Sequence, residues 1–304
     1  MGTYSHRVAM VDCIGACHVD VKATVDGPVV MGTSNPVRVG RTPGGVACNV
    51  ARWLARLGIP VALHSMVGDD EAGRGLIDRL GGEGVGVEGI DVVPGASTAK
   101  YTAVLDPAGS LVLGIADMGI YDRMDAGWAE GILRRLGSSL LLADANLTEA
   151  AVATIARGKQ GRRLVADPVS VSKATRIAPW LDRIDAVFPD RGEAAALSGR
   201  DAPRAAAETL VRAGANVVVI TLGAEGVVVA DESGSTLRPA VAPRRIVDVT
   251  GAGDALVAGY LFGLAVGEAD PVGWGLAAAS LAVETVDTVP ESVTRDLVRS
   301  RLPR

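Results

Sequence analysis

Short apolar runs alternate with longer helix-like patterns along most of this 304-residue chain. The segment 217–221 reads Val-Val-Val-Ile-Thr, and such a continuous apolar run is typical of a parallel strand that is buried on both faces. Strands that alternate with helices form a parallel sheet covered by helices. The sequence therefore predicts an α/β fold with a mostly parallel central sheet.

The individual elements can be placed from the spacing of apolar residues. Strands are expected at Val8–Ile14, Val61–Met66, Ser139–Asp144, Leu164–Asp167, Ala186–Phe188, Val217–Thr221 and Val227–Ala230. Helices are expected at Val46–Leu57, Ala72–Leu80, Ala126–Leu136, Glu149–Arg157, Pro203–Ala213, Ala252–Val266 and Val272–Val286. No internal repeat or low-complexity linker interrupts this series, so we expect one domain over residues 1–304.

Two segments, about residues 19–40 and 98–116, look like strands and turns without helices. The second contains a hairpin pattern, in which Tyr101–Leu105 and Leu111–Leu113 flank the turn residues Asp106–Gly109. Both segments precede helical blocks and can meet in space. We expect them to form a small β-sheet lid over the main domain, and the alternative is a pair of ordinary surface hairpins.

Composition excludes several classes of partner. The chain has 30 Lys and Arg against 35 Asp and Glu, which gives a formal net charge of −5 with both signs scattered. Neither a basic stripe for nucleic acid nor a polybasic membrane patch is visible. The N-terminus has no signal-peptide pattern, and no stretch approaches the ~20 apolar residues of a membrane span. We therefore expect a cytoplasmic protein whose partner is a small molecule.

The strongest functional signal is the segment Asp248-Val-Thr-Gly-Ala-Gly-Asp254, which opens a helix of small residues. Gly251, Ala252 and Gly253 place consecutive backbone N–H groups at the helix N-terminus, where free donors and the helix dipole favour an anion. Charge that develops on a transferred phosphoryl group would be stabilised there. Asp254 can accept the proton of an attacking hydroxyl. The plainer alternative is that Asp254 is a favourable acid in a first helical turn.

A second signal is the segment Gly44-Gly45-Val-Ala-Cys-Asn49, which lies at the start of another expected helix. The two glycines allow the backbone to pass close to a ligand. Asn49 carries a donor and an acceptor that suit a pair of sugar hydroxyls. Its alternative role is to cap the helix.

Together these two segments resemble the two signatures of the ribokinase-like (PfkB) family of carbohydrate and nucleoside kinases. Their order and the length of the chain also fit, and the resemblance runs from about residue 8 to residue 289. It implies a ribokinase-like three-layer α/β/α domain with a small β-sheet lid. It also implies that the chain phosphorylates a hydroxymethyl group with ATP and Mg²⁺.

The resemblance assigns roles residue by residue. It implies that Asp254 is the catalytic base and that residues 251–253 form its anion hole. The residues expected to bind sugar hydroxyls are Asp20, Gly44, Gly45 and Asn49. The residues expected to bind the nucleotide are Thr221, Gly223, Gly226 and Ala278, the last in a helix that packs against adenine.

The resemblance also implies two cation sites. Family members usually carry Asn-x-x-Glu near the metal-linked phosphates, and here the stretch reads Asp190-Arg-Gly-Glu193. Mg²⁺ keeps several waters and leans on substrate phosphates, so we expect Asp190 and Glu193 to act through water. Their alternative role is to cap the helix that follows. Asp248 and the loop 284–289 fall where many members bind a monovalent cation, which implies K⁺.

Within the family, three segments look most like those of pseudouridine kinases: Ile115–Met118, Asp144–Leu147 and Asp167–Ala174. Strand ends of an open α/β sheet face the ligand crevice. We therefore expect a nucleobase pocket lined by Asn146, Asp167 and Lys173, with the lid residues Thr98, Lys100 and Asp117 closing over it. Other nucleosides, ribose and ketohexoses stay open as substrates, because a turn after a strand and a solvated lysine would occur in a plain sugar kinase too.

Two other readings are disfavoured. Gly84–Gly89 matches Gly-x-Gly-x-x-Gly, but a strand-like run follows it, so the context of a dinucleotide site is missing. A protein of this fold that binds ligand without chemistry would be favoured by loss of Asp254 or of the glycine-rich turn, and both are present.

Exposed strand edges of a lid often pair with another subunit, so we also expect a homodimer.

Overall fold

The computed structural model describes residues 9–302 and contains two separate sheets. The large sheet has nine strands in the order β13-β12-β11-β10-β9-β8-β1-β4-β5. Their bounds are β1 (Val11–Ile14), β4 (Val61–Gly68), β5 (Gly86–Val93), β8 (Leu140–Asp144), β9 (Arg163–Asp167), β10 (Ala186–Val187), β11 (Val217–Thr221), β12 (Val227–Asp231) and β13 (Gly234–Arg238). All neighbours are parallel except the β11–β12 and β12–β13 pairs at one edge.

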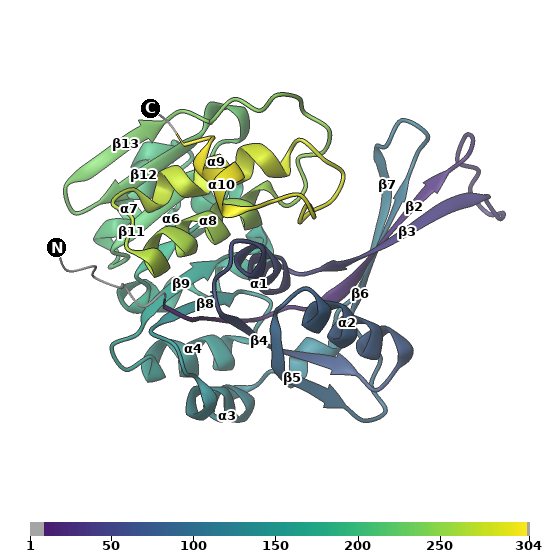
Figure 1. Cartoon of the computed structure of the whole chain (residues 1–304), viewed down its shortest axis with the longest axis horizontal. Coiled ribbons are helices and arrows are strands. Elements are labelled where there is room, and N and C mark those ends of the chain that lie inside the picture. Colours follow the sequence, from purple (N-terminus) through teal and green to yellow (C-terminus); the bar gives the residue numbers. More distant parts are fainter. Residues whose placement is uncertain (1–8, 303–304) are drawn as a thin grey trace.

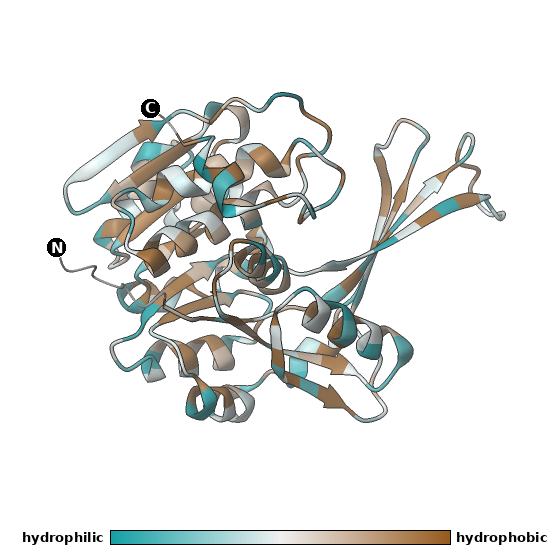
Figure 2. Cartoon of the chain, in the orientation of Figure 1, coloured by the Kyte–Doolittle hydropathy of each residue, from teal (hydrophilic) through white to brown (hydrophobic). Residues whose placement is uncertain are grey.

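Helices cover both faces of the large sheet. They are α1 (Val46–Arg56), α2 (Glu71–Gly82), α3 (Ala126–Arg135), α4 (Glu149–Gly158), α5 (Val171–Ala174), α6 (Arg191–Ser198), α7 (Pro203–Arg212), α8 (Ala252–Val266), α9 (Pro271–Ala282) and α10 (Arg295–Arg299). One core joins alternate strand residues such as Leu142 to α1, α8 and α9, and a second core joins residues such as Leu141 to α3, α4 and α7. Figure 2 shows the central strands hydrophobic along their length, as a sheet buried on both faces requires.

The small sheet projects away from this body (Figure 1). It has the order β3-β2-β6-β7, with β2 (His18–Val25), β3 (Val37–Gly44), β6 (Lys100–Leu105) and β7 (Leu111–Asp117). The β2–β6 pair is parallel and the other two pairs are antiparallel. We call this sheet the lid. The side chains of alternate residues lie on opposite faces, so Asp20 and Lys22 share one face of β2 and Val19 and Val21 share the other.

The structure confirms the expected fold class, a three-layer α/β/α domain with a mostly parallel sheet and a small β-sheet lid. The first strand is shorter than expected, and Val8 lies outside the described residues. Helix α9 ends at Ala282, before the expected end at Val286, because the chain turns into an irregular loop. Gly84–Gly89 leads into β5 and not into a helix. Within residues 9–302, no helix is long and apolar enough to cross a membrane.

Candidate active site

The candidate site lies at the carboxyl ends of the parallel strands, where ligands bind in open α/β sheets. Asp144 ends β8 and Asp167 ends β9, and the two residues are direct neighbours in the sheet register. Helix α1 begins at Val46, directly after the lid strand β3. The base of the lid therefore continues directly into this edge of the sheet (Figure 1).

Asp254 lies in the first turn of α8, which begins directly after Gly251. Gly251 has φ 80°, a left-handed conformation that a glycine adopts without strain. The backbone N–H groups of Gly251 and Gly253 have no hydrogen-bond partner among residues 9–302, and that of Ala252 makes a long contact of 3.3 Å to the Val249 carbonyl. The helix start thus offers donors to an anion beside the Asp254 carboxylate.

The Asn49 side chain points at Asp254 and does not cap its own helix. Its Nδ2 donates to Asp254 Oδ2 at 2.8 Å, and the N-cap of α1 is Gly45. Asn49 is buried, and its Oδ1 has no hydrogen-bond partner in the described structure. An unpaired buried acceptor is costly, so this atom suits a donor supplied by a ligand.

The electrostatic surroundings of Asp254 suit a general base. Burial raises the pKa of Asp254 to about 7, the hydrogen bond from Asn49 lowers it, and the negative charges of Asp144 and Asp20 raise it. A carboxylate with a pKa near neutral pH is ionised in a large fraction of molecules yet basic enough to take a proton. The sequence marked Asp254 for this role, and the structure adds the three neighbours that tune it.

Close packing around Asp20 explains the glycine pair. A Cβ at Gly44 would lie 2.2 Å from Asp20 Oδ2, and a Cβ at Gly45 would lie 2.4 Å from the Ala16 carbonyl oxygen. His18 Nε2 lies 3.1 Å from Asp20 Oδ1 and fixes the carboxylate from the other side. Gly44 therefore lets the chain pack closely against Asp20, and Gly45 lets the start of α1 pack closely against the loop after β1.

Asp144 is the residue that the sequence reasoning missed. It has no exposed surface, and its carboxylate accepts hydrogen bonds from the backbone N–H groups of Ala16 (2.9 Å), Ala47 (3.0 Å) and Asn146 (2.9 Å). It thus joins the loop after β1, the first turn of α1 and the loop after β8. A Cβ at Gly15 would lie 2.3 Å from the Asp144 carboxylate, so the position needs a glycine. The signals available in the sequence were the glycine just after one strand and the acid at the end of another.

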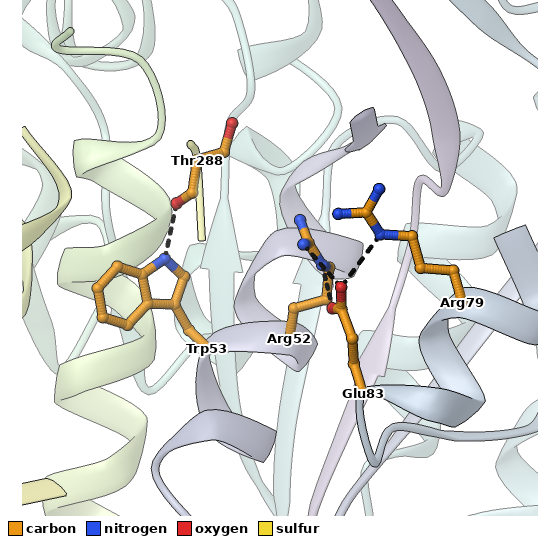
Figure 3. Close-up of polar contacts among 5 residues, drawn as sticks. All are labelled: Arg52, Trp53, Arg79, Glu83 and Thr288. Carbon is orange, nitrogen blue, oxygen red and sulfur yellow. Dashed lines mark hydrogen bonds and ion pairs between the residues drawn. The ribbon is translucent and has the colours of Figure 1, made fainter. Parts of the chain in front are cut away.

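Helix α1 is fixed on two sides, as Figure 3 shows. The Trp53 indole N–H donates to the Thr288 carbonyl at 3.0 Å, and the Thr288 methyl group packs against Gly251. On the other side, the buried Arg52 makes a two-pronged ion pair with Glu83, which also accepts from Arg79. These contacts hold α1, and hence Asn49, in register with the start of α8.

Comparisons with known proteins identify the family of the chain. The model of the family described as "pfkB family carbohydrate kinase" matches residues 8–294. The chain belongs to this family. As a member, it is a kinase that transfers a phosphoryl group to an alcohol group. The resemblance seen in the two glycine-rich segments is thereby confirmed.

Three relatives illustrate how similar the kinase is to known proteins. Pseudouridine kinase of Escherichia coli is 34% identical over 81% of this chain and 80% of its own. Pseudouridine kinase of Arabidopsis thaliana is 26% identical over 94% of this chain and 93% of its own. A carbohydrate kinase from Agrobacterium tumefaciens has a TM-score of 0.84 with 29% identity, covering 97% of this chain and 98% of that one.

The structure brings two of the expected base-pocket residues of the kinase together. Lys173 Nζ donates to Asn146 Oδ1 at 2.6 Å, and burial lowers the pKa of Lys173. Arg176 donates hydrogen bonds to the carbonyls of residues 145–147 and so holds the loop that carries Asn146. Lys173 is therefore a half-buried residue of the site edge and not a solvated helix lysine.

The third expected base-pocket residue, Asp167, is more completely buried than Lys173. Burial raises the pKa of Asp167 well above its usual range, and the charges of Asp254 and Glu193 act in the same direction. Its Oδ1 accepts from the N–H of Val169, whose φ of 67° is strained for a branched side chain. Strained backbone is often found at functional sites.

The two acids expected near the phosphates form a capping box at the start of α6. Asp190 Oδ1 accepts from the N–H of Glu193, and Glu193 Oε2 accepts from the N–H of Asp190. Burial raises the pKa of Glu193 to about 7. Capping explains the spacing of the pair and leaves one oxygen of each carboxylate for other partners. No cluster of three or more metal-binding side chains occurs in the described part of the chain.

The lid residues expected to close over a base are less favourably placed. Thr98 is buried, and its hydroxyl donates to Asp70 and accepts from the Gly68 N–H. Lys100 pairs in register with Val19, which puts it on the face of the lid opposite Asp20. Asp117, at the end of β7, is paired with Lys100 in the same register. Contact of these residues with a base stays a prediction, one that this arrangement does not favour.

The residues expected to bind the nucleotide follow β11, farther along the row of strand carboxyl ends, or lie in α9. Thr221 ends β11, and Gly223 and Gly226 bound the turn that follows, both with positive φ. A Cβ at Gly226 would meet the Arg238 carbonyl at 2.1 Å, so this glycine is required by packing. Ala278 has no exposed surface in α9, so a contact to adenine would fall to its partly exposed neighbour Ala279.

Asp248 is already occupied by protein groups. Lys22 of the lid donates to its Oδ2 at 2.8 Å, and the N–H of Thr250 donates to its Oδ1 at 2.9 Å. Burial opposes its charge, but these hydrogen bonds outweigh that effect and lower the pKa of Asp248. In this arrangement Asp248 does not fit as a ligand of a free K⁺ ion, because the Lys22 ammonium takes that place.

Proposed function

We propose that the kinase transfers the γ-phosphate of ATP to the 5'-hydroxyl of pseudouridine, giving pseudouridine 5'-phosphate. The observation that carries the chemistry is the Asp254 carboxylate, held by Asn49 beside the free N–H groups at the start of α8. The choice of nucleoside is supported by the 34% identity with the pseudouridine kinase of Escherichia coli.

Asp254 acts as the general base in this proposal. With a pKa of about 7 it takes the proton of the primary hydroxyl as that oxygen attacks the γ-phosphate. The N–H groups of residues 251–253 stabilise the charge on the transferred group. Closure of the lid excludes water, which would otherwise compete as the acceptor.

The ribose is held by groups on both sides of Asp254. The unpaired Oδ1 of Asn49 accepts from one sugar hydroxyl, and the Asp20 carboxylate accepts from another. Gly44 and Gly45 leave room for the ring, because any side chain there would displace Asp20 or the loop after β1. The proposed role of Asn49 is therefore double, since it binds substrate and adjusts the base.

The base pocket is formed by Asn146 and Lys173, which already contact each other. The uracil ring presents both donors and acceptors. Lys173 supplies donors only, and Asn146 supplies both kinds. A plain sugar has no ring to contact the Asn146 and Lys173 side chains, which favours a nucleoside.

A magnesium ion fits the donors near the phosphate end of the site. Asp190 and Glu193 each keep one carboxylate oxygen free of the capping box. Carboxylates that act through water, together with phosphate oxygens, are the usual surroundings of Mg²⁺. When bound there, Mg²⁺ would neutralise charge on the phosphates.

The second candidate is a sugar kinase, or a kinase of another nucleoside. It is favoured by the likeness to the carbohydrate kinase from Agrobacterium tumefaciens, at 29% identity over nearly the whole chain. The residues around Asp254 would serve either substrate equally. Only the base pocket separates the two proposals.

The test is an assay of ADP release with ATP and Mg²⁺, run in parallel on pseudouridine, uridine, cytidine, ribose and fructose. We expect the highest kcat/KM with pseudouridine. Lys173→Met should lower kcat/KM for pseudouridine about tenfold or more, as loss of a charged hydrogen bond does, and leave slow turnover of ribose unchanged. The control is Lys159→Met, because Lys159 lies near the amino ends of β9 and β10, away from the site. A preference for ribose or fructose would overturn the nucleoside assignment.

We also propose that the chain forms a homodimer through the outer face of the lid, the face opposite Asp20. Register places Val39, Leu113 and Ile115 on that face, exposed by 47%, 51% and 53%. An exposed apolar sheet face is stabilised when a second copy covers it. Light scattering should give the mass of a dimer, and Ile115→Glu should give a monomer. A monomeric parent protein would refute this. The cytoplasmic location expected from the sequence stays a prediction.

A further inference from the structure

An ion pair joins the lid to the segment that carries the anion hole. Lys22 lies on the same face of β2 as Asp20, two residues farther along the strand. Its Nζ donates to Asp248 Oδ2 at 2.8 Å, across 226 residues of sequence. The Lys22 and Asp248 side chains are 39% and 24% exposed, so water is partly excluded from the contact.

Asp248 in turn holds the backbone just before the anion hole. Its second carboxylate oxygen accepts from the N–H of Thr250 at 2.9 Å, one residue before Gly251. Residues 244–250 contain no helix or strand, and Asp248 is the single one among them that is not exposed. The carboxylate therefore fixes the approach of the chain to α8.

Few other contacts secure this segment within the described structure. The N–H of Val247 donates to the Val283 carbonyl at 2.8 Å, and the N–H of Arg244 donates to Glu284. Both of these contacts lie before Asp248. From Asp248 to Gly251, two backbone hydrogen bonds run into the start of α8, from Ala252 N–H to the Val249 carbonyl and from Ala255 N–H to the Gly251 carbonyl. Among the described residues, the contacts from this stretch to other parts of the fold are the Lys22–Asp248 ion pair and the Thr288 methyl against Gly251.

We propose that Lys22 is a positioning residue that couples lid closure to assembly of the anion hole, an inference that rests on the proposed phosphoryl transfer. Asp20 and Lys22 move together because they lie on one rigid strand. When the lid brings Asp20 onto the sugar, it brings the Lys22 ammonium onto Asp248. Asp248 then orders Thr250 and presents the N–H groups of the following turn.

The coupling acts on the populations of the open and closed lid. An interaction present in only one of two states shifts their equilibrium by its own free energy. Lys22 does not touch the reacting atoms, so its loss should lower kcat and leave the KM for ATP nearly unchanged. Couplings of this kind change equilibria by roughly 5- to 150-fold, and a partly exposed pair belongs at the low end of that range.

The test compares the full-length wild type with Lys22→Met and Lys22→Arg, on whichever acceptor the wild type turns over fastest. Lys22→Met should lower kcat by about tenfold. It should also raise the fraction of ATP hydrolysed without transfer, because an ill-closed lid admits water. Lys22→Arg should restore both values, since Arg keeps the charge. The matched control is Arg38→Met, which breaks the exposed lid ion pair with Asp26 at 3.1 Å.

A double-mutant cycle with Asp248→Asn separates coupling from general damage. If Lys22 acts through Asp248, the double variant should be no slower than Asp248→Asn alone. Additive losses, or full activity and tight coupling in Lys22→Met, would overturn the proposal.

Failure of the proposed substrate leaves this test intact. If the wild type rejects pseudouridine but accepts another acceptor, the same variants are compared on that acceptor. If it accepts none, amide exchange of residues 248–253 replaces turnover as the readout. Exchange there should be faster in Lys22→Met than in the wild type and in Arg38→Met, and equal exchange in all three would refute the coupling.

Discussion

The hydrogen bond from Asn49 to Asp254 should set the acidic limb of the pH–rate profile. The N–H donor stabilises the charged carboxylate, so its removal raises the pKa of Asp254 above about 7. The change is Asn49→Leu, which keeps the size of the side chain and removes the donor. A hydrogen bond to a charged group contributes about 1.5–3 kcal/mol, and one pKa unit equals about 1.4 kcal/mol, so we expect the pKa to rise by at least about one unit.

The magnitude follows from the fraction of ionised base. For a pKa that moves from about 7 to about 8, the ionised fraction falls roughly eightfold at about pH 6.5 and barely changes at about pH 9. Asn49 also contacts substrate in our proposal, and losing that contact lowers kcat/KM equally at every pH. The excess loss at acidic pH therefore isolates the effect on the base.

The assay is kcat/KM for the acceptor from about pH 5.5 to 9.5, because this ratio reports the free enzyme. The matched control is Asn216→Leu, which removes an exposed Asn–Asp hydrogen bond to Asp185 on the opposite edge of the sheet. The control should keep the wild-type profile. An acidic limb in Asn49→Leu that stays in place or moves to lower pH would refute the reasoning, even if the variant is slow.

Two further predictions concern packing and stability. Gly44→Ala should raise the acceptor KM by roughly tenfold, because its Cβ would displace the Asp20 carboxylate, whereas Gly40→Ala on the same strand has open space and should change nothing. Native Glu193 holds its proton up to about pH 7 and unfolded Glu releases it near 4.5, so its contribution to stability falls as pH rises through that window. Calorimetry should therefore find Glu193→Gln, which still accepts from Asp190, equal to wild type at acidic pH and more stable by roughly 1–3 kcal/mol above pH 7.

The parts of the site predicted from sequence are those that are contiguous in it. Asp254 and the turn before it form one segment, and a strand–turn–helix context is readable from composition and apolar spacing. The contact of Asn49 with Asp254 spans 205 residues and depends on how α1 packs against α8. No local pattern records such a distance, so sequence reasoning left open whether Asn49 binds or caps.

Strand register decides which face of the lid each side chain lies on, and the sequence does not show that register. A shift of one residue moves a side chain to the other face of a sheet. The sequence placed Lys100 in the lid but carried no information on its partner, and pairing with Val19 turns it away from Asp20. The same register turns Lys22 toward Asp248, where a K⁺ site was expected.

Helix α9 shows another reason why the sequence could not identify site residues. Ten of its residues are buried, so it is apolar all round and has no amphipathic stripe. Sequence alone could not tell which side faces a ligand, and Ala278 proves to face the core. The sequence showed Asp144 as a strand end but not its role as an acceptor, because its three backbone donors come from three separate segments.

The central claim is that Asp254 is the base of a phosphoryl transfer. The most direct measurement is steady-state turnover of Asp254→Asn beside the wild type and the exposed control Asp201→Asn, on the same acceptor. The account predicts that kcat of Asp254→Asn falls by about 100-fold or more with little change in the acceptor KM, because general-base catalysis contributes about that much. A kcat near that of the wild type, or a loss confined to KM, would contradict it.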